Sequence, residues 1–146
     1  MEPLEHILQE ITSFETQLSR RSFIGAALLV AVASKTSLAN DDRRFIDAVA
    51  ATLIPATALQ STGINVGQNI DYLLSKGSAD HRQKVTRFLA WSQRASILYG
   101  GDKVAINARG SRFMLVRKMG RTLSSLCLIA FWADERALKL IDEVRV

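Results

Sequence analysis

Apolar residues recur along most of this chain with the spacing of helices that are buried on one side. From Asn40 onward they return every three or four residues, which predicts five helices, at about 40–54, 66–75, 78–99, 111–132 and 134–146. No alternation with a period of two lasts beyond four residues, so no strand is expected. We therefore predict an all-α fold, a small bundle of about five helices.

The expected ends of these helices coincide with residues that stop or cap helices. Pro55 ends the first one, because proline cannot continue a helix. Segments 56–65 and 102–110 show no apolar stripe and are predicted to be loops. The expected N-caps are residues whose side-chain oxygen can accept a hydrogen bond from the first turn: Asn65, Ser78 and Asp134. The last helix is expected to turn three apolar residues inward: Leu138, Ile141 and Val144.

A different pattern precedes residue 40. Two adjacent arginines, Arg20 and Arg21, lead into the apolar or small residues 23–33, a run too short to span a bilayer core of about 30 Å as a helix. Such a run is typical of the central region of a signal peptide. Ser37-Leu38-Ala39 follows as a small-x-small triplet, so we expect cleavage after Ala39, with Ala33 as a weaker site.

The stretch Ser19-Arg20-Arg21-Ser22-Phe23-Ile24 resembles a twin-arginine (Tat) signal, whose pattern is Ser-Arg-Arg-x-Phe-Leu/Ile. The resemblance implies recognition by the Tat translocase through Arg20, Arg21 and Phe23, and export of a folded protein to the periplasm. The chain then divides into a signal peptide, residues 1–39, and a helical domain, residues 40–146. Two alternatives stay open: an ordinary amphipathic or buried helix that carries an Arg-Arg pair, and an uncleaved signal that remains as a membrane anchor.

Composition removes several classes of function. The 146 residues include one cysteine and two histidines, which excludes a disulfide framework, a four-ligand Cys/His zinc site and c-type haem attachment. Residues 1–39 hold three basic and four acidic side chains (net −1), so residues 40–146 hold the other sixteen and ten (net +6). A basic body suggests an acidic protein surface, anionic lipid or nucleic acid as partner. Nucleic acid is not expected, because an exported protein does not meet it.

Short motifs in the body resemble the small subunits of membrane-associated flavin dehydrogenases, the gluconate 2-dehydrogenase subunit 3 family and the related sorbitol, fructose and glucose dehydrogenase subunits. These motifs are Thr52-Leu53-Ile54-Pro55, Ile70-Asp71-Tyr72-Leu73-Leu74 and Phe131-Trp132-Ala133-Asp134. The resemblance implies a complex in which the catalytic subunit holds FAD and a cytochrome c subunit passes electrons to the quinone pool. This chain would then be a non-catalytic escort with no cofactor or small-molecule substrate of its own. The alternative is a free-standing exported helical binding protein, tethered to the membrane where its signal is not cleaved.

Five residues are candidates for a partner interface. Cys127 lies on the apolar side of its helix. It is either a small buried hydrophobic residue or one half of an intersubunit disulfide with the catalytic subunit. Phe131 and Trp132 are adjacent, so one is expected to pack inside and the other to serve as an interface anchor. Arg117 and Arg121, one helical turn apart, belong to the strongest basic cluster, and form either a solvated face or a docking site for an acidic partner or anionic headgroups.

Overall fold

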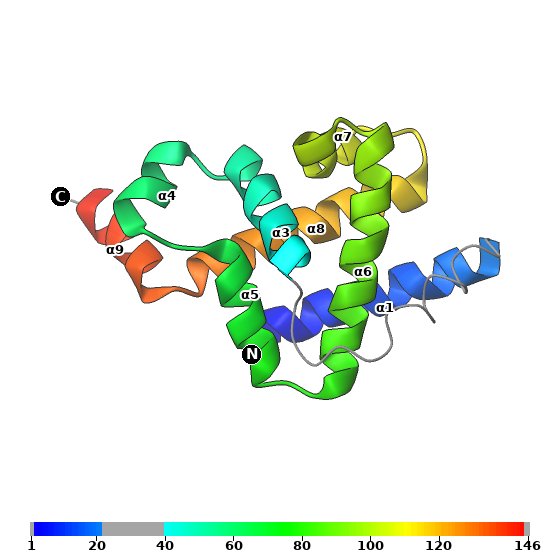
Figure 1. The fold of residues 1–146 in the computed structure, drawn as a ribbon, viewed down its shortest axis with the longest axis horizontal. Helices are drawn as coiled ribbons and strands as arrows, with labels where there is room; N and C mark the ends of the chain where they lie inside the picture. Colours follow the sequence, from blue (N-terminus) through cyan, green and yellow to red (C-terminus); the bar gives the residue numbers. More distant parts are fainter. Residues whose placement is uncertain (1, 22–39, 145–146) are drawn as a thin grey trace.

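The computed structural model describes residues 2–21 and 40–144, and this part of the chain is helical with no strand (Figure 1). It contains eight α-helices and one short 3₁₀ helix. In chain order they are α1 (Glu2–Arg21), α3 (Asn40–Leu53), α4 (Ala56–Thr62), α5 (Val66–Ser75), α6 (Ala79–Leu98), the 3₁₀ helix η1 (Gly101–Lys103), α7 (Val104–Arg109), α8 (Met114–Trp132) and α9 (Glu135–Val144). The prediction of an all-α fold is confirmed.

Helix α8 is the centre of the bundle. It runs across the molecule in Figure 1 and packs against α1, α3, α5, α7 and α9. Its buried side carries Met119, Leu123, Leu126 and Ala130, as the apolar stripe predicts. The predicted stripes of α3 and α6 are also buried, and the predicted caps Asn65 and Ser78 accept hydrogen bonds from the backbone N–H groups of Gln68 and His81.

The predicted count of five helices is wrong, because both segments expected to be loops are helical. Helix α4 follows Pro55 directly and has no buried residue, so it carries no stripe that periodicity could detect. Helix α7 is only six residues long, less than two turns, yet Val104, Ala105 and Ala108 are fully buried. It packs closely on α8 at Gly120, where an added Cβ would lie 2.8 Å from the Cβ of Ala108.

The rotation of α9 about its own axis also differs from the prediction. Among residues 135–141 of this helix Ala137 is the buried one, whereas Leu138 and Ile141 are exposed. The hydrogen bonds that hold the turn at Asp134 fix where α9 begins and therefore which side it turns to α8. The expectation that Leu138 and Ile141 face inward is wrong, and the side chain of Val144 lies outside the described part.

Helix α1, the segment that precedes the arginine pair, is part of the hydrophobic core. It packs on α8 and α6 and buries five apolar side chains: Leu4, Ile7, Leu8, Ile11 and Phe14. The ring of Phe14 meets that of Phe88 edge to face, with centroids 5.6 Å apart. Arg20 and Arg21 form the last turn of this helix, while their side chains, Phe23, the run 23–33 and Ala39 lie outside the described residues.

Polar contacts fix the register of α1 on its neighbours. The Arg87 guanidinium donates from Nε and Nη2 to the two carboxylate oxygens of Glu15, at 3.0 and 3.3 Å, and both side chains are mostly buried. The Lys118 ammonium donates to Ser13 Oγ at 2.7 Å, and the Thr122 hydroxyl donates to Glu10 Oε2 at 3.2 Å. Since α1 uses both its apolar and its polar side chains against α6 and α8, it docks in one specific position.

Candidate interaction surface

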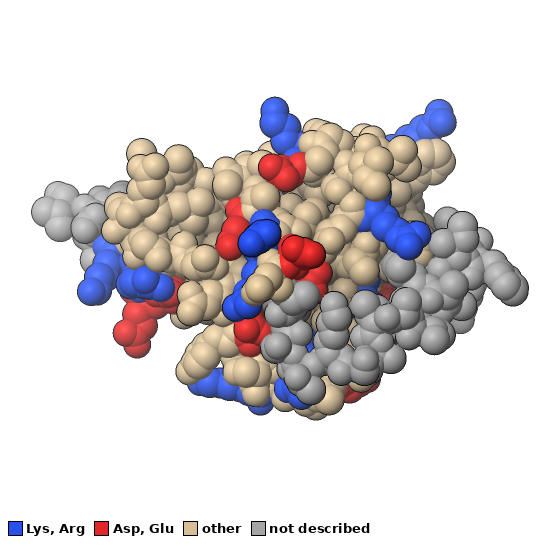
Figure 2. Space-filling view, in the orientation of Figure 1, with Lys and Arg blue, Asp and Glu red and all other residues tan. Residues whose placement is uncertain are grey.

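The positive charge of the molecule is concentrated where α6 ends and α8 begins. Residues 94–121 contain seven lysines and arginines and a single acidic residue, Asp102. In Figure 2, basic side chains lie along the upper right of the molecule, where α6 and α7 end in Figure 1. An excess of one sign over one region produces a local field that attracts anionic groups.

One part of this region is a basic cavity of about 580 Å³ between α1, α7 and α8. Its lining residues are Glu10, Arg109, Lys118, Arg121, Thr122, Ser124, Ser125 and Leu128. Lys118 and Glu10 are held by their contacts across the α1–α8 interface, whereas Arg109 and Arg121 are exposed and make no ion pair or hydrogen bond with any described residue. Two unpaired guanidinium groups beside an ammonium group suit a carboxylate or phosphate, which arginine can bind through two parallel hydrogen bonds.

The structure separates the predicted pair Arg117 and Arg121. Arg121 lines the basic cavity, but Arg117 is half-buried and donates from Nη1 to the backbone oxygen of Ser111 at 2.9 Å. Arg117 therefore braces the loop before α8, and Arg109 and Lys118 accompany Arg121 instead. Sequence spacing alone misses this grouping because the turn between α7 and α8 brings residues 109 and 121 together.

A second hollow is an apolar groove of about 290 Å³ between α1, α6 and α8. Phe14 of α1, Trp91 and Leu98 of α6, and Leu115, Val116 and Met119 of α8 line most of it. In the sequence, Trp91 and Leu98 stand at the edges of the apolar stripe of α6. That position indicates that they lie at the border of the core and not inside it. The buried indole N–H of Trp91 has no hydrogen-bond acceptor among the described residues.

The remaining interface candidates divide between the core and the surface. Cys127 is fully buried, and burial, followed by the negative charge of Asp47, raises the pKa of its thiol to about 12. It is thus the small buried hydrophobe of the first alternative. The intersubunit disulfide stays a prediction, and it requires the sulfur to become accessible. Phe131 is buried while Trp132 is 44% exposed, so the expected division of this pair between inside and outside is confirmed.

A polar cluster at the start of α9 was not predicted as a group. Asp134 caps α9 by accepting from the backbone N–H of Arg136 at 2.9 Å, as its position predicted, and also accepts from the Arg136 guanidinium at 2.8 and 3.0 Å. Asn69 of α5 donates to Asp134 Oδ2 at 3.0 Å and to the backbone oxygen of Ala130 at 3.1 Å. The Arg136 hydrogen bonds hold the pKa of the Asp134 carboxyl well below its usual range. This cluster joins α5, α8 and α9 and acts in stability.

Within the described residues, no group of three or more His, Cys, Asp or Glu side chains is placed to hold a metal ion. None of the described helices combines the length and the apolar character that a membrane span needs. Comparisons with protein-family models, with curated proteins and with solved structures find nothing that matches this chain. The resemblance to dehydrogenase small subunits therefore rests on the short motifs themselves.

Proposed function

We propose that this chain is the non-catalytic small subunit of a periplasmic, membrane-associated, FAD-dependent sugar or polyol dehydrogenase complex. It supplies the Tat signal and a docking surface for the catalytic subunit, which carries the flavin. The observation that carries this proposal is the twin-arginine sequence at the end of a helix that docks on a folded, basic body. The Tat route exports folded proteins, so a folded small protein with this signal is suited to escort a partner.

The positions of the family motifs in the fold support the proposal. Thr52-Leu53-Ile54-Pro55 lies where α3 ends and α4 begins, and Ile70 and Leu74 of the second motif are buried on α5. In the third motif, Phe131 packs inside and Trp132 is available for a partner. Each motif thus holds a boundary or a packing position that a relative of the same fold would need.

The proposal is tested in cells that express this chain together with the flavoprotein proposed as its partner. Replacing Arg20 and Arg21 by lysine should leave the flavoprotein in the cytoplasm, because the Tat translocase reads the arginine pair. Reversing the charges at Arg109 and Arg121 should weaken co-purification of the two chains, whereas Lys139→Glu on exposed α9 should not. Full periplasmic dehydrogenase activity after deletion of this chain would contradict the proposal.

The second candidate is a free-standing exported binding protein, and the closed core of the single chain favours it. Helices α1, α3 and α5–α9 contribute buried residues to one continuous apolar cluster. Under this hypothesis the native protein, isolated from the periplasm at its natural abundance, is a monomer that co-purifies with no other polypeptide. Size-exclusion chromatography with mass spectrometry of the eluted peak separates the two candidates.

A further inference from the structure

Four apolar residues are exposed at the end of α6 and the start of α8, two segments that the 3.3 Å contact between Tyr99 Oη and Ser111 Oγ brings together; one of the four, Leu98, lines the apolar groove. Ile97 and Leu98 are each 83% exposed, Phe113 is 55% exposed and Met114 is 52% exposed. Single exposed apolar residues are common on proteins, but a contiguous group of large ones marks an interaction site. We call these four residues and the groove the tip surface.

We propose that the tip surface docks this protein on an anionic membrane surface. This inference concerns the chain's own contact with lipid and does not depend on a flavoprotein partner. Proteins that lie in a membrane interface bury protruding apolar side chains at the boundary between headgroups and acyl chains, with arginines or lysines around them. The tip surface has both features.

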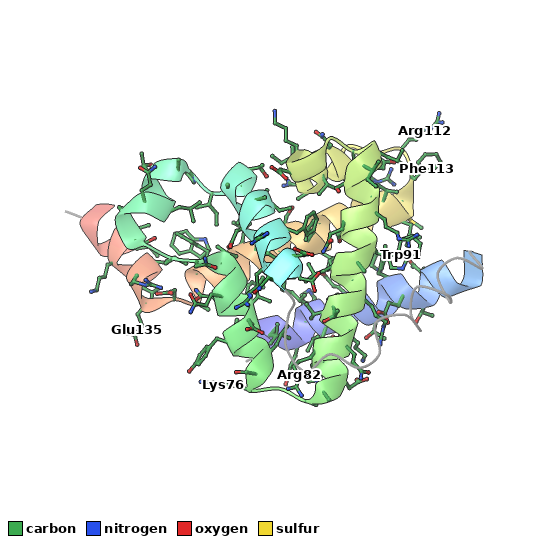
Figure 3. All side chains as sticks on the ribbon, in the orientation of Figure 1. Lys76, Arg82, Trp91, Arg112, Phe113 and Glu135 are labelled. Carbon is green, nitrogen blue, oxygen red and sulfur yellow. The ribbon has the colours of Figure 1, made fainter. Side chains whose placement is uncertain are left out.

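Two exposed basic side chains, Arg94 and Arg112, lie at the tip surface. Arg94 lines the apolar groove from α6 and is exposed. The Arg112 guanidinium lies 5.1 Å from the centre of the Phe113 ring, and Figure 3 shows both side chains pointing outward from the bundle. The only acidic residue between positions 94 and 121 is Asp102. A charge of one sign fits a lipid surface of uniform negative charge better than a protein surface, which presents both signs.

The groove between these residues gives an acyl chain or a lipid carbonyl a place to enter. Its walls are almost entirely apolar, and Trp91 lies on the side of α6 that faces α1 in Figure 3. The buried indole N–H of Trp91 lacks an acceptor among the described residues, and leaving a buried donor unpaired costs about 1–3 kcal/mol. A carbonyl oxygen brought by a lipid would satisfy that donor.

The test uses the full chain and its two tryptophans as position-specific reporters. Trp132→Phe leaves Trp91 at the tip surface, and Trp91→Phe leaves Trp132 near α9. Each protein is mixed with vesicles of phosphatidylglycerol and phosphatidylethanolamine that carry brominated acyl chains, which quench a nearby indole. We expect strong quenching of Trp91 and little quenching of Trp132. With vesicles of phosphatidylcholine alone, which carry no net charge, we expect no binding.

Every variant in this experiment contains the apolar run 23–33, so that run cannot explain a difference in binding between variants. Matched substitutions therefore assign the binding to the tip surface. Arg94→Gln with Arg112→Gln should weaken binding to the anionic vesicles by about thirtyfold, at roughly 1 kcal/mol for each basic residue. Leu98→Ser with Phe113→Ser should weaken it by at least tenfold. The control, Tyr72→Ser with Lys76→Gln at exposed positions in α5 and directly after it, should leave it unchanged.

Three results would overturn the proposal. The first is equal quenching of Trp91 and Trp132, and the second is unchanged affinity in both tip-surface variants. The third is dimerisation in solution that the Leu98→Ser, Phe113→Ser variant abolishes, since a second copy would then be the occupant.

Discussion

Replacing Ile11 by alanine tests whether α1 belongs to the folded protein. Ile11 is 0% exposed and lies between α1 and the α6–α8 pair. Removing a fully buried isoleucine side chain costs about 2–5 kcal/mol, from lost transfer free energy and from the cavity left behind. Ile97→Ala is the control, since Ile97 is 83% exposed and a surface substitution changes stability by about 0.5 kcal/mol or less.

The assay is urea unfolding of the full chain, followed by circular dichroism at 222 nm. With a slope of about 2 kcal/mol per molar urea, Ile11→Ala should lower the midpoint by roughly 1–2.5 M. Ile97→Ala should leave the midpoint in place. If α1 did not pack on α6 and α8, Ile11→Ala and Ile97→Ala would have the same urea midpoint. That result would refute the packing of α1.

The ion pair between Arg87 and Glu15 gives an independent measurement of the same docking. Both side chains are largely buried, so removing one partner leaves the other charge without compensation. In a double-mutant cycle with Arg87→Met and Glu15→Gln, the coupling free energy should lie within about 0.5–3 kcal/mol. A coupling of zero would show that α1 sits elsewhere.

Three further predictions concern the rest of the bundle. Gly120→Ala places a Cβ 2.8–3.0 Å from three atoms of α7. The resulting strain of about 1–3 kcal/mol should outweigh the gain in helix propensity of roughly 1 kcal/mol. Thermal unfolding should therefore show a loss of stability for Gly120→Ala and none for the control, Gly110→Ala. The folded pKa of Asp134 is lowered, so its stabilisation is complete above about pH 4 and is lost as the pH falls further. Asp134→Asn should therefore flatten the acid limb of the stability curve, and Asp80→Asn should not. The Cys127 thiol should react with Ellman's reagent at least a hundredfold more slowly in the native protein than in urea, and equal rates would mean that it is accessible.

The long helices were predictable because their burial repeats over several turns. The stripes of α3, α6 and α8 each extend over more than two turns, and most of their residues are buried as expected. Helix α7 was not predictable by this means, since six residues are too few to show a period. The signal that remained was its two alanines, Ala105 and Ala108, which allow the close approach to Gly120 that only the tertiary structure reveals.

The candidate site was predictable in composition but not in grouping. The sequence identifies 109–121 as the most basic segment, yet the loop and turn between α7 and α8 decide that Arg121 lies with Arg109 and Lys118 while Arg117 turns to Ser111. The apolar groove needs Phe14, Trp91 and Leu115, from three helices that are far apart in the chain. Such a site depends on helix packing, which periodicity does not specify.

The packing of α1 alters the physical consequences of a signal peptide that ends at Ala39. The apolar residues of α1 recur with helical spacing, yet the signal-peptide prediction places them outside the helical domain. In the structure they cover Phe88 of α6 and the apolar side of α8. Cleavage after Ala39 breaks the covalent link but leaves this apolar contact, so α1 either stays bound or exposes a face that another chain must cover. If the protein is an obligate small subunit, the catalytic subunit covers that face. If it is a free-standing protein, α1 has to stay bound to residues 40–146. Whether residues 40–146 keep their fold without α1 therefore separates the two proposed functions on physical grounds alone.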